Sequence, residues 1–265
     1  MDNERRSNFL ESGQELIVEG DPLETLRKCG GYYACPKDFN GKRLGALVGY
    51  AGKYKDIDGQ EKNYVGDVYF NFAMADEYPS VLKHFSEAIK DNLTKQLGEI
   101  DILCGAPIGG YSFSTMLGLV LEKQTIKAEK KITAVATPNS REQSQLVFAR
   151  HNIKSGVKYA IVEDVCNNFS TTEELIKLIN SKGGNVTTII CLLNRSEKVD
   201  SQYHTTQSLN NTPVVCDVPV VSLVRQVIQE YLQDDPAVVE DIANGNVVWK
   251  PKDDWKRLMD ATQTS

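Results

Sequence analysis

Apolar and polar positions follow two alternating patterns from residue 79 to residue 235. Short runs of consecutive apolar residues are typical of buried strands, and apolar residues three and four positions apart are typical of amphipathic helices. This alternation predicts an α/β fold, a parallel sheet flanked by helices. The predicted strands are 100–104, 132–137, 159–162, 186–193 and 214–221, and the predicted helices are 79–98, about 111–122, and one that begins near 170 and ends before Gly183.

The last part of this pattern is the least regular. Residues 196–212 are polar and indicate a connection between strands. Pro213 and Pro219 limit the backbone pairing of 214–221, so we expect an edge strand there. Residues 222–232 are amphipathic, and the pattern breaks at 234–236.

The segments outside 79–235 differ in composition. Residues 1–20 are polar and predict a flexible N-terminus, and residues 21–78 are rich in glycine and tyrosine and predict a small β-rich subdomain. Asp58 and Gly59 indicate a hairpin turn within it. Residues 236–265 form a C-terminal extension, which packs either on 21–78 or on a partner subunit.

Composition and charge narrow the classes of function. The chain has 265 residues, 41% of them hydrophobic, and a net charge of −6, which argues against broad nucleic-acid binding. No apolar run approaches the ~18 residues of a membrane helix, and the N-terminus lacks an apolar secretion core. Six cysteines form no CxxC pattern. Cys29 and Cys35 could pair, but we expect a reduced, cytoplasmic protein without a membrane partner.

Residues 158–178, KYAIVEDVCNNFSTTEELIKL, carry the strongest chemical signal. A buried strand ends in Glu163 and Asp164, a polar loop follows at 165–170, and a helix comes next. Two overlapping capping-box spacings, Ser-x-x-Glu and Thr-x-x-Glu, mark the start of this helix. Its free N–H groups and dipole favour a phosphate, and carboxylates suit sugar hydroxyl groups.

A second strand, loop and helix unit precedes the first. The predicted strand 100–104 runs into Gly-Ala-Pro-Ile-Gly-Gly at 105–110, and a helix follows. Glycine lets backbone amides approach phosphate oxygens closely. Both loops follow strands of the predicted parallel sheet, and open α/β sheets bind ligands at the carboxyl ends of their strands.

The two acids, the short loop and the following Ser-Thr resemble the ribose-phosphate signature of type I phosphoribosyltransferases, closest to the orotate branch. The chain departs from it in having Asn167-Asn168-Phe169 where that signature usually has Thr-Thr-Gly. It also has Gly109 where orotate-type enzymes usually carry a lysine in the diphosphate loop. The resemblance covers 100–235 well and the N-terminal segment only loosely.

The resemblance implies transfer of a phosphoribosyl group from phosphoribosyl diphosphate (PRPP) to a nitrogen base, with release of diphosphate. The expected base is orotate or a similar pyrimidine. Mg²⁺ would be held through PRPP and water, and a homodimer is expected. Residues 21–78 would form a hood over the base. The implied PRPP-binding residues are Glu163, Asp164, Asn167, Asn168, Phe169, Ser170, Thr171, Ala106, Pro107, Ile108, Gly109 and Gly110.

Three arginines receive roles from the same resemblance. The family has a mobile loop at 138–156, for which Arg141 is the first choice of a catalytic cation and Arg150 the second. Arg195 follows the strand 186–193 and would hold the carboxylate of the base, because a guanidinium binds a carboxylate through two parallel hydrogen bonds. Asp164 would be the second catalytic residue.

Two other classes of function remain open from the sequence: a non-catalytic PRPP or nucleotide sensor, and a subunit of a larger assembly. Phe169 bears on the first of them. A bulky residue is disfavoured at positive φ. We therefore expect Phe169 to keep a negative φ and to turn its ring away from the phosphate, onto the hood or the neighbouring helix.

Overall fold

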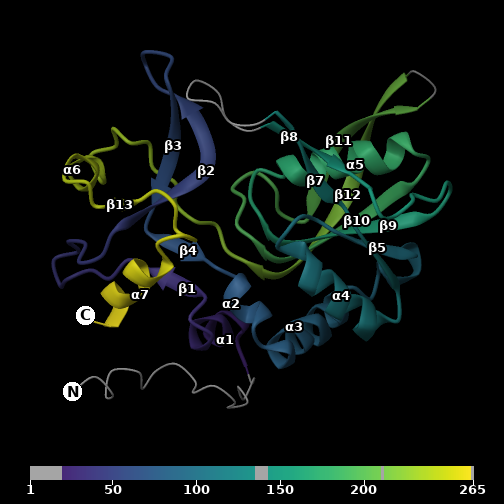
Figure 1. Ribbon diagram of the computed structural model, residues 1–265, viewed down its shortest axis with the longest axis horizontal. Coiled ribbons are helices and arrows are strands. Elements are labelled where there is room, and N and C mark those ends of the chain that lie inside the picture. The colour runs from purple at the N-terminus through teal and green to yellow at the C-terminus, as the bar shows by residue number, and fades with distance from the viewer. Residues whose placement is uncertain (1–19, 135–142, 210–211, 264–265) are drawn as a thin grey trace. The chain divides into compact units, whose positions relative to one another are not determined.

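The computed structural model describes residues 20–134, 143–209 and 212–263. The chain divides into two compact units, one formed by residues 78–227 and the other by the residues before 78 together with those from 228 onward. Each unit has its own sheets and its own apolar cluster (Figure 1).

The unit 78–227 is built on a six-stranded sheet with the strand order β11-β12-β10-β9-β5-β6. β5, β6, β9, β10 and β12 run parallel, and β11 is antiparallel to β12. This confirms the predicted parallel sheet. The strands are β5 Ile102–Gly105, β6 Gln124–Lys127, β9 Lys158–Cys166, β10 Asn185–Asn194, β11 Gln202–Leu209 and β12 Thr212–Arg225.

Helices cover both faces of this sheet. α3 and α4 pack together on one face and α5 lies on the other (Figure 1). Residues at the centre of β9 and β10, among them Ile161, Ile189 and Cys191, are fully buried with Leu175 and Ile179 of α5. The helical elements are α3 Pro79–Asn92, the short 3₁₀ helix Leu97–Glu99, α4 Gly110–Leu121 and α5 Ser170–Ser181.

The structure corrects the prediction for 196–232. The segment predicted as a polar connection contains β11, which is the edge strand, and β12 is an inner strand between β11 and β10. β12 continues to Arg225, so the amphipathic pattern of 222–232 begins in a strand. The prolines are compatible with this position because Pro213 and Pro219 pair with β11 alone, and β10 pairs with β12 only from Val220 onward.

Residues 129–147 also differ from the prediction. β7 Glu129–Ala134 and β8 Gln143–Val147 pair in an antiparallel two-stranded ribbon outside the main sheet. The sequence predicted a strand at 132–137 and no regular structure after it. The patternless stretch hid β8 because, among its described side chains at 144–147, only Leu146 is buried against the apolar cluster.

The second unit is rich in β-structure, as expected for 21–78. β2 and β3 form the predicted hairpin, and Gly59 has a φ of 76° at its turn. β13 is parallel to β2 in one sheet, and β1 and β4 form another. The elements are α1 Pro22–Lys28, β1 Tyr32–Ala34, β2 Leu47–Lys55, β3 Glu61–Gly66, β4 Val68–Phe70, α2 Ala73–Asp76, α6 Val239–Ala243, β13 Val247–Val248 and α7 Trp255–Gln263.

The C-terminal extension packs on the residues before 78, one of the two partners that the sequence left open. β13 pairs with β2, and Trp255 donates from its indole nitrogen to the carbonyl oxygen of Gly30 at 3.0 Å. Arg43 donates to the carbonyl oxygen of Ala237 at 2.7 Å and to a carboxylate oxygen of Asp241 at 3.1 Å. The extension therefore completes this unit.

All six cysteines are free thiols, so the possible pair of Cys29 and Cys35 does not form a disulfide. Of the helices that the structure describes, none combines the length and the apolar character needed to cross a membrane.

Candidate functional site

The two acids lie inside β9, which extends to Cys166, four residues beyond the predicted strand end. Side chains alternate along a strand, so Glu163 and Asp164 point to opposite faces of the sheet. Glu163 is 8% exposed, whereas Asp164 is only partly buried. One carboxylate oxygen of Asp164 accepts a hydrogen bond from the backbone N–H of Val165 at 2.9 Å. The pair therefore has one buried and one accessible carboxyl group.

The two carboxyl groups differ in their electrostatic setting. Burial, together with a smaller effect of the negative charge of Asp164, raises the pKa of Glu163 to about 8, and the charge of Lys130 opposes this shift. At neutral pH the Glu163 carboxyl group is therefore mainly protonated. It can donate one hydrogen bond, which an ionised carboxylate cannot do.

The glycine loop 105–110 packs directly against the end of β9. A Cβ atom placed on Gly109 would lie 2.1 Å from a carboxylate oxygen of Asp164, and one on Gly110 would lie 2.2 Å from the carbonyl oxygen of Val162. The backbone N–H of Ala106 donates to the same Val162 oxygen at 2.9 Å. The glycines thus bring the two loops together at one edge of the sheet.

This packing explains the missing loop lysine. Any side chain at position 109 must displace the Asp164 carboxylate, because the two would occupy the same space. Within the loop, Ala106 is buried, Pro107 is partly buried and Ile108 is 77% exposed.

The second loop contradicts the prediction for Phe169. Its φ is 58° and its ψ is 18°, in the left-handed region, where we expected a negative φ. The ring is 3% exposed and stacks on Tyr203 of β11, with ring centroids 5.0 Å apart and 13° between the planes. Phe169 belongs to the apolar cluster of this unit, which also contains Leu175 and Ile176 of α5, so its ring packs into the core. Burial of the ring holds the backbone in a conformation that local sterics disfavour.

The start of α5 lies where the sequence predicted it, at Ser170, but without the predicted capping boxes. No side chain caps the helix at Phe169. Glu173 accepts a hydrogen bond from the hydroxyl of Tyr203 at 2.9 Å, and Glu174 accepts one from the backbone N–H of Leu146 at 2.7 Å. Both acids thus bind neighbouring strands, which a spacing rule along one helix cannot reveal.

The loop before α5 has a partly open surface. Asn168 and Ser170 are exposed, and Asn167 and Thr171 are partly buried. The side-chain oxygen of Asn168 accepts a hydrogen bond from the backbone N–H of Ser170 at 3.1 Å. This bond closes a local turn within the loop.

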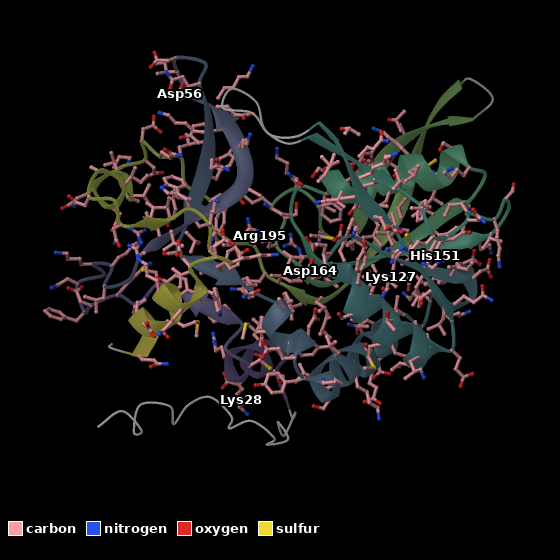
Figure 2. The ribbon with its side chains drawn as sticks, viewed as in Figure 1. Lys28, Asp56, Lys127, His151, Asp164 and Arg195 are labelled. Carbon is pink, nitrogen blue, oxygen red and sulfur yellow. The ribbon has the colours of Figure 1, made fainter. Side chains whose placement is uncertain are left out.

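A basic cavity of about 370 Å³ lies beside the glycine loop. Its cations come from β6, the β7–β8 ribbon and the segment after that ribbon. In the view of Figure 2, Asp164 lies between Lys127 and Arg195. The lining residues are Pro107, Ile108, Tyr111, Lys127, Glu129, Lys130, Arg150 and His151.

Arg150 was selected from the sequence, whereas Lys127 and Lys130 were missed. Arg150 is close to Glu129, with 3.7 Å between the guanidinium nitrogen and the carboxylate oxygen. The signal for the lysines was the cluster Lys127, Lys130 and Lys131, at the end of β6 and the start of β7. Arg141 lies outside the described residues, so its predicted role stays a prediction.

Arg195 is buried and follows the last residue of β10, beside the end of β9, where Asn194 pairs with Cys166. The loop after it is held by side chains. Asn194 donates to the carbonyl oxygens of Val199 and Asp200 at 3.0 and 2.9 Å. Sequence reasoning missed Arg225, at the end of β12, which donates to a carboxylate oxygen of Asp200 at 2.9 Å and to the carbonyl oxygen of Asn194 at 3.2 Å.

No protein-family model matches the chain. The chain is similar to an orotate phosphoribosyltransferase of Carboxydothermus hydrogenoformans, with 28% identity over 50% of this chain and 64% of the relative. It is equally similar to an adenine phosphoribosyltransferase of Ruminiclostridium cellulolyticum, with 28% identity over 42% of this chain and 68% of the relative. The chain therefore spans less than two thirds of the length of the orotate relative.

Among solved structures, the orotate phosphoribosyltransferase of Aeropyrum pernix covers 77% of this chain and is itself covered over 94%, with a TM-score of 0.46 and 16% identity. The curated relatives confirm the resemblance that the two loops indicated.

Proposed function

Since the chain is related to the phosphoribosyltransferases, we propose that it transfers the phosphoribosyl group of PRPP to a nitrogen base and releases diphosphate. One observation carries this proposal: the Asp164 carboxylate and Gly109 are in such close contact that no side chain fits between them. The carboxylate proposed to bind the sugar and the loop proposed to bind the diphosphate thus meet at one sheet edge.

The two loops would divide the substrate between them. Asp164 would accept hydrogen bonds from the ribose hydroxyl groups, and the protonated Glu163 would remain a buried neutral neighbour. Residues 167–171 would hold the 5′-phosphate at the start of α5, where backbone N–H groups and the helix dipole favour an anion. The loop 106–110 would hold the diphosphate through its backbone.

The reaction requires little covalent work from the protein. A ring nitrogen of the base forms a bond to the anomeric carbon and loses its proton to solvent. The bond from that carbon to the diphosphate oxygen breaks, and its electron pair leaves on diphosphate. The protein must align the two reactants and stabilise negative charge on the leaving group. Lys127, Lys130 and Arg150 line a cavity beside the glycine loop and suit that charge. Arg141 is proposed to add to them.

A magnesium ion fits the residues present. Mg²⁺ is usually bound through one or two carboxylates together with substrate phosphates and water. Asp164 offers one accessible carboxylate beside the diphosphate loop. When bound, the ion would neutralise charge on the diphosphate.

The base is proposed to be orotate or a similar carboxylated pyrimidine. Arg195 supports this choice, because it stands at the end of β10, the neighbour of the strand that carries Asp164. A guanidinium group can bind the carboxylate of orotate through two hydrogen bonds. The equally similar adenine relative makes adenine the necessary comparison.

Turnover assays with PRPP and Mg²⁺ test the proposal, with orotate and adenine each supplied as the base. We expect nucleotide and diphosphate from orotate, with loss of activity in Asp164→Asn. PRPP binding without turnover of either base would favour the sensor class. Absence of PRPP binding would refute the proposed site. Sedimentation of the purified protein tests the proposed homodimer.

A further inference from the structure

Tyr203 of β11 contacts both sides of the loop that precedes α5. Its ring stacks on Phe169, the residue directly before the helix, with 5.0 Å between centroids. Its hydroxyl donates to a carboxylate oxygen of Glu173, in the first turn of the helix, at 2.9 Å. Residues 170–172 lie between these two contacts, so one side chain holds the segment that presents the helix N–H groups.

The conformation of Phe169 makes such a contact necessary. A non-glycine residue at a φ of 58° is disfavoured, because its Cβ atom comes close to the backbone. The φ and ψ angles of Phe169 set the direction of the Ser170 N–H group that follows it. If the backbone relaxed to negative φ, this N–H group would turn and the path of the loop would change.

The hydroxyl of Tyr203 keeps its donor role near neutral pH. Burial, with a smaller contribution from the bond to Glu173, raises the pKa of Tyr203 to about 12. The phenol therefore retains its proton and donates a hydrogen bond to the carboxylate of Glu173. Glu173 is held from its other side by Lys177 at 3.0 Å.

We propose that Tyr203 is a positioning residue for 5′-phosphate binding, because its contacts with Phe169 and Glu173 hold the loop before α5 in its left-handed path. The proposal rests on the proposed function, since it takes this loop as the 5′-phosphate site. In this chain a stacked aromatic pair replaces the backbone freedom of the glycine that such loops usually carry. Tyr203 need not touch the substrate to fulfil this role.

The test compares Tyr203→Leu and Tyr203→Phe with a control, Val186→Ala. Val186 belongs to the same apolar cluster but lies at the other end of the sheet, at the start of β10. Two ligands separate the proposed subsites: ribose 5-phosphate carries the 5′-phosphate, and inorganic diphosphate would bind the glycine loop. Their affinities are measured by calorimetry, and amide hydrogen exchange of residues 168–172 is measured without ligand.

We expect Tyr203→Leu to weaken ribose 5-phosphate binding by about tenfold, the ratio that corresponds to losing a well-formed aromatic pair. Hydrogen exchange at the amides of Ser170 and Thr171 should accelerate. Diphosphate affinity should change by less than about twofold, which is small beside the tenfold loss expected for ribose 5-phosphate. Tyr203→Phe keeps the stacked ring and should recover most of the ribose 5-phosphate affinity. Val186→Ala should change neither affinity.

Two results would overturn the proposal. Ribose 5-phosphate affinity and exchange rates that are unchanged in Tyr203→Leu would show that the loop holds its path without the ring. Equal losses for both ligands in Tyr203→Leu and Val186→Ala would show a general loss of stability. Failure of the unmodified protein to bind either ligand is a different result, because it would refute the proposed function itself.

Discussion

Replacing Glu163 by glutamine should change how the stability of the protein depends on pH. The folded state raises the pKa of this carboxyl group from 4.5 to about 8, so between these values the folded protein holds a proton that the unfolded chain has released. Stability falls with rising pH wherever the folded state binds more protons. The stabilising contribution of the protonated Glu163 carboxyl group is therefore lost as pH rises from 4.5 toward 8. Glu163→Gln removes this pH dependence of the stability.

The size of the effect follows from the shift. Each pH unit inside the window corresponds to about 1.4 kcal/mol, so between pH 5.5 and 7.5 the free energy of unfolding should fall by roughly 2–3 kcal/mol more in the original protein than in Glu163→Gln. Little solvent screening is expected, because the side chain is 8% exposed. Comparing the slopes of unfolding free energy against pH in the two proteins cancels the contributions of the carboxyl groups that both proteins share.

Urea unfolding at several pH values, followed by circular dichroism, measures both slopes. Glu122→Gln, an exposed change at the end of α4, is the control and should keep the slope of the original protein. Asp164→Asn should move the upper end of the window to lower pH, because the charge of Asp164 is the second cause of the shift. Parallel slopes for the original protein and Glu163→Gln would refute the assignment of a buried, protonated Glu163.

Three further predictions concern the proposed site. Gly109→Ala should weaken PRPP binding by at least about tenfold in calorimetry with Mg²⁺, because the added methyl group displaces Asp164. Gly98→Ala is the control, because the space around Gly98 is open, and equal PRPP affinities of the two variants would contradict the packing. Asp164→Asn should lower PRPP affinity with an unchanged circular dichroism spectrum, and unchanged affinity would remove Asp164 from the site. Arg195→Ala should weaken a carboxylated pyrimidine by about 10- to 100-fold and PRPP much less, whereas equal losses would make Arg195 structural.

The sequence by itself determined the presence of α3, β5, α4, β9, α5 and β10 and the two loops at the ends of β5 and β9. These features are local. A strand such as β10 is recognised from its consecutive apolar residues, and α5 from its apolar spacing and the glycines after it. Parallel strands then place their carboxyl ends at one edge, so the meeting of Asp164 with the glycine loop was predictable.

Contacts between distant residues were decided only by the tertiary structure. β11 reads as a polar connection because one of its faces is exposed, and only its pairing with β12 makes it a strand. Glu163 and Asp164 are adjacent in sequence, yet only the sheet decides which of them is buried. The left-handed Phe169 is the clearest case: local sterics predict negative φ, and packing against Tyr203, 34 positions later, outweighs them. Burial and stacking energies depend on which side chains meet in space, and spacing along the chain does not contain that information.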